Sequence, residues 1–270
     1  MSVLESVELV TRILDLLAAS SVPLGVTEVA QALGEGKSRI HRNLVSLKHF
    51  GYVTQNQVSD KYALGWKLFQ LGEKASLESN IRQVAAPYLK YLSSRTHLGA
   101  MLAVPINGTP LVVDSVANEG FVSISVKPGN KPLPLKSAQG RVALAYASRA
   151  QFDEILRLHL PGLAGEKVDA AWHTRLDKRL AAIRENLYET APNETLIGIN
   201  VLSAPVLRGP DELVAIVSVV GSIQHLADPP GPAVRDAVLG VAAALSRFMG
   251  STVYEARGIP ALAISSEPPA

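Results

Sequence analysis

The sequence predicts an α+β protein with two domains, a helical N-terminal domain that ends in a small hairpin and a larger C-terminal domain with an antiparallel sheet. Three observations lead to this class. Apolar residues recur at helical spacing through the N-terminal part of the chain. A pair of short strand-like runs and a further helical segment follow, and the rest mixes helical and alternating periods. A chain of 270 residues is long enough for two domains.

The composition limits the possible functions. The chain has 47% hydrophobic residues, a formal net charge of +2 and no cysteine. This hydrophobic content excludes whole-chain disorder, and the lack of cysteine excludes disulfides, thiolate metal sites and cysteine nucleophiles. No apolar run approaches ~18 residues, and the N-terminus lacks the basic and apolar segments of a signal peptide. We therefore expect a cytoplasmic protein that does not enter a membrane.

The first domain, residues 1–65, is expected to contain three helices and a hairpin. Helical periodicity covers residues 7–17, 27–33 and 37–50. Ser6 and Thr27 are the candidate N-caps of the first two helices. The strand-like runs 52–54 and 61–64 enclose a polar tip, which predicts the hairpin. Residues 66–80 are helical again and are expected to link the two domains.

The second domain, residues 81–250, alternates between helical and strand-like segments. Strands are expected at 100–105, 110–116 and 121–126 as an antiparallel meander, and at 199–207 and 212–220 as a hairpin. Helices are expected at 81–97, 138–147, 151–158, 169–186 and 232–248. Proline, alanine, serine and glutamate dominate from Arg257, so residues 251–270 are expected to form a disordered tail.

The third expected helix has an uneven charge distribution. The first 80 residues hold eight cations and eight anions, yet residues 37–50 carry four cations and no anion. Apolar positions assign one face of this helix to the core, which leaves the side chains of Lys37, Ser38, His41 and Arg42 outside. A basic helix is by itself more often a solvated surface. A short helix and a glycine turn before it are typical of a helix-turn-helix, whose second helix enters the major groove of DNA. The hairpin would be a wing that brings Lys61 near the phosphates.

Other chemistry has little support in the sequence. The six histidines are dispersed and form no metal-binding spacing, and no nucleophile, dinucleotide or phosphate-loop motif occurs. We therefore expect no enzyme activity, no metal and no cofactor. Trp66 and Trp172 are expected to be packing anchors.

Several segments in order resemble the IclR-type transcriptional regulators. Residues 5–17 look like the first helix of that family, 36–44 like its recognition helix, and 51–53 and 61–65 like its wing and the exit to its linker helix. In the second half, residues 137–145, 198–206 and 215–221 are similar to a helix and two strands around the family's ligand pocket. The resemblance implies a winged helix-turn-helix followed by a GAF-like domain. It also implies a homodimer or dimer of dimers that binds operator DNA and is controlled by a small-molecule effector, often a carboxylate, at catabolic operons.

Within this resemblance, the expected effector site differs from the family pattern. Apolar or small residues stand where polar anchors are common: Ala191, Val201 and Val220. Because an unpaired buried oxygen costs about 1–3 kcal/mol, a ligand with an aromatic or aliphatic body fits better than a very small polar acid. The predicted site consists of Phe121, Ser123, Ser137, Ala138, Gly140, Glu194, Val201, Ser218 and Val220. A one-residue error in strand register would instead make Val201 and Val220 sheet core.

Two hypotheses for the first domain remain. In the first, Lys37, Ser38, Arg39, His41, Arg42 and Lys61 bind DNA as part of a ligand-responsive regulator. In the alternative, the protein is a small-molecule sensor whose winged helix binds a protein partner. A basic helix without an acid disfavours the alternative.

Overall fold

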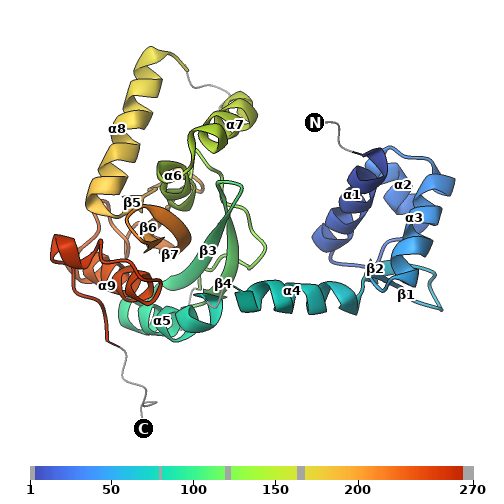
Figure 1. The fold of residues 1–270 in the computed structure, drawn as a ribbon, viewed down its shortest axis with the longest axis horizontal. Coiled ribbons are helices and arrows are strands. Elements are labelled where there is room, and N and C mark those ends of the chain that lie inside the picture. Colours follow the sequence, from blue (N-terminus) through green and yellow to red (C-terminus); the bar gives the residue numbers. More distant parts are fainter. Residues whose placement is uncertain (1–3, 79–80, 119–122, 163–167, 264–270) are drawn as a thin grey trace, which may run out of the picture. The chain divides into compact units, whose positions relative to one another are not determined.

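The computed structural model describes residues 4–78, 81–118, 123–162 and 168–263, and the chain divides into two compact units, residues 1–80 and 81–270 (Figure 1). Helices surround a two-stranded hairpin in the first unit and a five-stranded antiparallel sheet in the second. The predicted α+β class is therefore confirmed.

The first unit contains three helices, a hairpin and a fourth helix. They are α1 (Glu5–Ala19), α2 (Val26–Leu33), α3 (Lys37–His49), β1 (Val53–Gln55), β2 (Tyr62–Leu64) and α4 (Trp66–Glu78). One face of each of the first three helices packs into a common core with the hairpin, because the apolar positions recur at helical spacing. The buried residues of this core are Leu9, Ile13, Leu17, Val29, Ala30, Ile40, Leu44, Leu47, Val53 and Tyr62.

The ends of α1 and α2 differ from the prediction. Leu4 precedes α1 and no side chain caps that end, so Ser6 is not the N-cap. Gly25 precedes α2, and its backbone N–H donates to the Glu28 carboxylate, so Thr27 does not cap this helix. Glu28, the third residue of α2, thus accepts from the backbone N–H of the N-cap residue, as the acid of a capping box does.

The sheet of the second unit joins the two hairpins that the sequence predicts. Its strands are β3 (Gly99–Ile106), β4 (Thr109–Val116), β5 (Glu189–Thr190), β6 (Ile199–Arg208) and β7 (Glu212–Ser222). They lie in the order β4-β3-β7-β6-β5, and all neighbours are antiparallel. The long-range pairing of β3 with β7 makes one sheet of the two hairpins.

Helices cover both faces of this sheet, as Figure 1 shows. Helices α5 (Ile81–Thr96) and α9 (Pro232–Phe248) pack on one face, where Val217 and Val219 of β7 contribute to the core. Helices α6 (Ala138–Ala145), α7 (Arg149–His159) and α8 (Ala170–Asn186) belong to the other side, where Ile216 and Val220 are buried. The alternation follows from the two-residue period of a strand.

The expected strand at residues 121–126 is wrong for the part that the structure describes. Residues 123–126 form no strand, and residues 121–122 lie outside the described residues. Strand β3 already pairs with β4 and β7. On the outer side of β4, Val112 exchanges backbone hydrogen bonds with Gly129 and Asn130 of the following loop. The apolar side chains of Ile124 and Val126 instead pack against the core under α6.

The expected disorder of the tail is also wrong for residues 251–263. Tyr254 is buried and its hydroxyl donates to the Pro205 carbonyl at 2.6 Å. A short 3-10 helix, η2 (Glu255–Arg257), follows, and the Leu262 N–H donates to the Gly240 carbonyl at 2.9 Å. One buried aromatic residue therefore anchors a segment whose composition suggests a loop. Residues 264–270 lie outside the described part of the chain.

Candidate functional site

Helix α3 exposes a basic surface along its N-terminal half. Ile40, Leu44 and Leu47 are buried, as the sequence predicts. Four exposed side chains lie on the other side: Lys37, Ser38, His41 and Arg42. No acid occurs in the first turn, and neither Lys37 nor Arg42 forms an ion pair with a residue that the structure describes. Two cations near a helix N-terminus attract phosphate.

The other two cations of the predicted DNA-binding set are paired with acids. Arg39 Nη1 lies 3.1 Å from Glu35 Oε2, and its Nη2 lies 3.4 Å from Glu5 Oε2. Lys61 Nζ, on the hairpin, lies 3.1 Å from Glu28 Oε1. The pKa of Glu28 is lowered by the hydrogen bond from Gly25 and by Lys61. Arg39 and Lys61 therefore present less free positive charge than Lys37 and Arg42.

Helix α4 exposes aromatic side chains instead of burying them within its unit. Trp66 is 69% exposed and stacks on Phe69, with the ring centroids 4.4 Å apart. The expectation that Trp66 is a packing anchor is therefore wrong for this unit. Trp172 on α8 is 9% exposed and belongs to the core of the second unit, as expected.

The start of α6 shows how Ser137 and Gly140 of the predicted effector site are held. Ser137 is the N-cap: its hydroxyl accepts from the Gly140 N–H at 3.0 Å and donates to the Leu133 carbonyl at 2.8 Å. A Cβ on Gly140 would lie 2.3 Å from the same carbonyl oxygen, so the loop packs directly on the glycine backbone. Ala138 between them is fully buried. The Gly140 N–H therefore already has a hydrogen-bond partner in this structure.

The three strand positions of the predicted site, Val201, Ser218 and Val220, lie on the sheet face under α6. Ser218 is fully buried and its hydroxyl lies 2.8 Å from that of Ser203 on β6. Val201 pairs in register with Val220, which is 3% exposed and part of the core. The hydroxyl pair is the polar feature of an otherwise apolar stretch of sheet.

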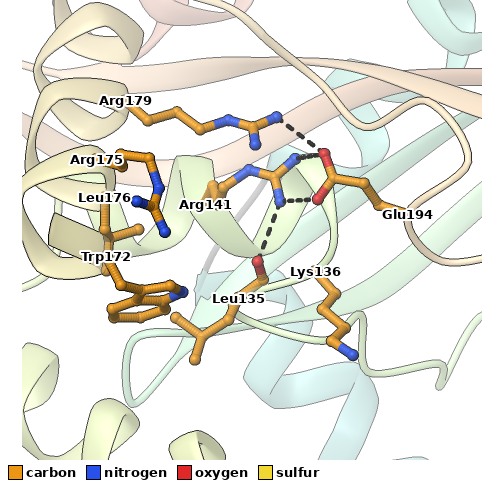
Figure 2. Close-up of a pocket in the computed structure, with 8 residues that line it drawn as sticks. All are labelled: Leu135, Lys136, Arg141, Trp172, Arg175, Leu176, Arg179 and Glu194. Carbon is orange, nitrogen blue, oxygen red and sulfur yellow. Dashed lines mark hydrogen bonds and ion pairs between the residues drawn. The ribbon is translucent and has the colours of Figure 1, made fainter. Parts of the chain in front are cut away.

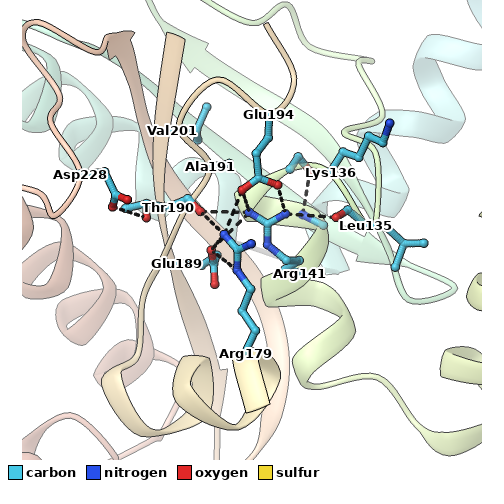
Figure 3. Close-up of polar contacts among 12 residues, drawn as sticks. Leu135, Lys136, Arg141, Arg179, Glu189, Thr190, Ala191, Glu194, Val201 and Asp228 are labelled. Atoms are coloured by element: carbon cyan, nitrogen blue, oxygen red, sulfur yellow. Dashed lines mark hydrogen bonds and ion pairs between the residues drawn. The ribbon is translucent and has the colours of Figure 1, made fainter. Parts of the chain in front are cut away.

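Glu194 does not join this group but belongs to an arginine network (Figure 3). Its two carboxylate oxygens accept from Arg141 Nη1 at 2.7 Å and Nη2 at 2.9 Å. Arg179 of α8 donates to Glu194 at 2.9 Å and to Glu189 at 2.7 Å. Burial disfavours the charged form of Arg179, but the hydrogen bonds and charges of Glu189 and Glu194 outweigh it and raise the Arg179 pKa. Glu194 therefore acts as a partner of arginines in this structure.

The remaining predicted residues lie apart. Ser123 is exposed, and Phe121 lies outside the described residues. Sequence reasoning missed Arg141, Arg175 and Arg179, which together with Glu194 line a cleft beside α8. It also missed Glu189, which pairs with Arg141 and Arg179. The spacing of Trp172, Arg175, Leu176 and Arg179 at i, i+3, i+4 and i+7 is the signal that places them on one helix face. A partner 53 residues away, as Glu194 is for Arg141, leaves no local signal.

Within the described residues, no group of His, Asp and Glu side chains could hold a metal ion. None of the described helices is long and apolar enough to cross a membrane.

Comparisons with known proteins give one consistent family. Residues 6–57 match the IclR helix-turn-helix domain, and residues 74–247 match the C-terminal domain of the bacterial transcriptional regulator IclR. The HTH-type transcriptional regulator XynR of Escherichia coli is 26% identical over 251 residues, which cover 93% of this chain and 99% of XynR. The glycerol operon regulatory protein of Streptomyces griseus is 28% identical over 250 residues, covering 92% and 97% of the two chains.

Solved structures of IclR-type regulators share the fold of this chain. The crystal structure of an IclR transcriptional regulator from Alicyclobacillus acidocaldarius superposes with a TM-score of 0.76 at 24% identity. The superposition covers 92% of this chain and all of that one. At this level of identity the likeness concerns the fold alone.

Proposed function

Because this chain belongs to the IclR family of bacterial transcriptional regulators, we propose that it binds operator DNA through α3 and that a small-molecule effector controls this binding. Family membership makes the chain a regulator rather than an enzyme. The observation that carries the DNA proposal is the exposed, acid-free N-terminal half of α3, with Lys37 and Arg42 free of ion pairs among the described residues.

The expected contacts follow from the chemistry of each side chain. Lys37 and Arg42 neutralise phosphates or bind the guanine edge, while Ser38 and His41 donate to or accept from base edges. Arg39 and Lys61 contribute less, because both already have carboxylate partners within the unit. The wing, formed by β1 and β2, then makes weaker contacts to the DNA phosphates.

We propose that the protein acts as a homodimer or a dimer of dimers. Trp66, Phe69 and Leu71 of α4 are 69%, 52% and 43% exposed, and such an apolar surface is stabilised when a second copy covers it. A two-fold dimer predicts a pseudo-palindromic operator. Light scattering at micromolar concentration measures the assembly, and a monomer would contradict this part of the proposal.

The proposed effector is a carboxylate with an aromatic or aliphatic body, bound near the start of α6 and the Ser218 position of β7. Support comes from the apolar Val201 and Val220 beside a single buried hydroxyl pair. The name of one relative, the glycerol operon regulatory protein, supports the proposal that the target is a metabolic operon.

Genomic-fragment selection followed by gel shift tests the proposal. The wild-type protein is expected to enrich discrete fragments, and Arg42→Ala is expected to weaken binding to them, whereas Arg149→Ala on α7 is expected to bind like wild type. No enriched fragment, together with salt-insensitive capture of a protein, would favour the alternative of a protein-binding winged helix. Thermal-shift screening with aromatic, aliphatic and small hydrophilic acids tests the effector class. Stabilisation by small hydrophilic acids alone would contradict it.

A further inference from the structure

A cleft of about 360 Å³ lies beside α8 in the second unit, and neither Ser203 nor Ser218 of the buried hydroxyl pair is among its lining residues. Figure 2 shows Trp172, Arg175, Leu176 and Arg179 along α8, Arg141 beside them, and Glu194 and Lys136 on the far side of Arg141, with the Leu135 side chain next to Trp172. This volume is at the small end of the range of small-molecule sites.

The walls of this cleft carry an excess of positive charge. Lys136, Arg141, Arg175 and Arg179 supply four cations, and Glu189 and Glu194 are the carboxylates that pair with Arg141 and Arg179. Neither Arg175 nor Lys136 forms an ion pair within the part of the chain that the structure describes. Arg175 and Lys136 therefore line the cleft without a carboxylate partner, and Figure 2 shows the Lys136 ammonium pointing away from α8.

The network behind the cleft also lacks an acceptor. Arg141 is 1% exposed, and its Nε is buried without a hydrogen-bond partner among the described residues. A buried donor without a partner is uncommon and costs about 1–3 kcal/mol. The arginine cluster is thus rich in donors and short of acceptors, which is the condition under which an added anion stabilises a site.

The other walls are apolar. Trp172 and Leu176 follow one another on the α8 face, and the Leu135 side chain lies next to Trp172. An inorganic anion would use the cations but leave these surfaces uncovered, whereas a ligand with a carbon body that carries two acidic groups uses both.

We propose that this cleft is a second ligand site, distinct from the proposed effector site at Ser218, and that it binds a small organic dianion of the dicarboxylate class. Its acidic groups are bound by Arg175 and Lys136, with Arg179 at the edge, and its apolar body lies against Trp172 and Leu176. Glu194 restricts the site to ligands that leave its bonds to Arg141 and Arg179 intact.

Trp172 provides a direct reporter for the test. The chain has two tryptophans, and Trp66 is on α4, so the full-length variant Trp66→Phe leaves Trp172 as the single indole. Phthalate, a flat dicarboxylate, is titrated against Trp172 fluorescence and, with the unmodified chain, by calorimetry. Benzoate supplies one charge on the same ring, and sulfate supplies two charges without a carbon body.

Saturable binding of phthalate, at least about tenfold tighter than that of benzoate or sulfate, is the expected result. Arg175→Ala combined with Lys136→Ala is expected to weaken phthalate binding by about tenfold or more. The matched control combines Lys178→Ala, an exposed cation on the same helix, with Lys131→Ala in the loop before Lys136, and is expected to bind like the parent. Circular dichroism checks that each variant is folded.

Ser218→Ala separates the two sites. Phthalate binding that persists in this variant supports the cleft, whereas loss of binding there would place the probe at the sheet and overturn the proposal. No saturable binding, or equal binding by the cleft variant and its control, would overturn it as well. Because the readout needs no DNA, its outcome is independent of the proposed operator binding.

Discussion

Arg141 and Glu194 form a two-point ion pair across the second unit, with Nη1 2.7 Å from Oε2 and Nη2 2.9 Å from Oε1. The Arg141 side chain is 1% exposed and that of Glu194 is 30% exposed. Arg141 also donates to the Leu135 and Thr190 carbonyls. One side chain of α6 thereby holds the loop before that helix and the segment that leads into β6. The pair fixes the cleft wall and the start of α6 together.

Arg141→Met is expected to lower the free energy of unfolding of the second unit by about 3 kcal/mol, because it leaves Glu189 and part of Glu194 buried with less compensation. Methionine keeps much of the volume, so the loss reports charge and hydrogen bonds rather than a cavity. Urea denaturation followed by Trp172 fluorescence in the Trp66→Phe background measures it.

Arg149→Met is the matched control for this prediction. Arg149 on α7 is 83% exposed and pairs with Asp153 at 3.0 Å, and exposed pairs of this kind contribute only about 0–1 kcal/mol. Equal losses in the two variants would show that burial of Arg141 has no energetic consequence. Adding Glu189→Gln and Glu194→Gln to Arg141→Met is expected to recover part of the stability, since no carboxylate then lacks its partner.

Alkaline pH is expected to destabilise the second unit through Tyr146. Burial raises the pKa of the Tyr146 hydroxyl to about 12 from the ordinary value of 10.0. The folded state therefore holds this proton more tightly than the unfolded state. The contribution is complete below pH 10 and is lost as the pH rises toward 12.

Tyr146→Phe removes the group that titrates. The unfolding free energy of this variant is expected to fall less steeply between pH 10 and 11.5 than that of wild type, by up to about 1.4 kcal/mol per pH unit. Denaturation at a series of pH values in constant ionic strength checks the slope. Burial also raises the pKa of Tyr254. Because Tyr254 remains in both proteins, its contribution to the pH dependence of the unfolding free energy is the same in each. Parallel curves for the two proteins would contradict the assignment to Tyr146.

The helices could be predicted from the sequence because their signal is local. Leu9, Ile13 and Leu17 repeat every four residues and are all buried. Ile40, Leu44 and Leu47, spaced by four and three residues, are buried as well. The pairing of β3 with β7 depends on residues more than 100 positions apart, and nothing in either strand specifies it. The expected strand at 121–126 was wrong over the described residues 123–126 for a related reason, since alternation alone does not show which strand edge is free.

The candidate site was predicted unevenly for the same reason. Exposure of Lys37 and Arg42 follows from helical periodicity, whereas the pairing of Arg39 with Glu5 joins residues 34 positions apart. Glu194 was expected to contact an effector because of the family resemblance. Its arginine partners were not foreseen, because Arg141 and Arg179 come from two helices distant from it in the sequence. Charge patterns indicate which residues are ionised, but only the fold decides which charges cancel.

Gly140→Ala is expected to destabilise the second unit by about 1–3 kcal/mol through overpacking. The added Cβ would lie 2.3 Å from the Leu133 carbonyl oxygen and 2.5 Å from Pro134 Cα, and backbone atoms cannot rotate away. Gly231→Ala before α9 is the control, because a Cβ at that position would have no neighbouring atom within 4 Å among the described residues. Thermal unfolding of both variants measures the difference, and an unchanged Gly140→Ala midpoint would show that the 133–134 loop can move.

The distribution of ion pairs on α3 predicts unequal contributions to DNA binding. Arg42→Ala and Lys37→Ala are each expected to reduce the slope of log affinity against log salt by about one, because each removes one free cation from the phosphates. Arg39→Ala is expected to change the slope less, since Arg39 is held by Glu35 at 3.1 Å and is closer to neutral in effect. Fluorescence anisotropy on a selected fragment at several salt concentrations measures all three slopes.

Glu35→Gln makes this comparison stricter. Removing the Glu35 carboxylate takes away the nearer acid partner of Arg39 and leaves only Glu5 at 3.4 Å, without changing a cation. The salt slope is therefore expected to become steeper and the affinity at low salt to rise. The exposed variant Glu8→Gln on α1 is the control for the loss of one negative charge from the unit, since Glu8 forms no ion pair with the described residues. Equal effects of the two substitutions would assign the change to net charge alone. A larger effect of Arg39→Ala than of Arg42→Ala would mean that Arg39 exchanges Glu35 for phosphate on binding, and the ranking of the α3 cations would have to be reversed.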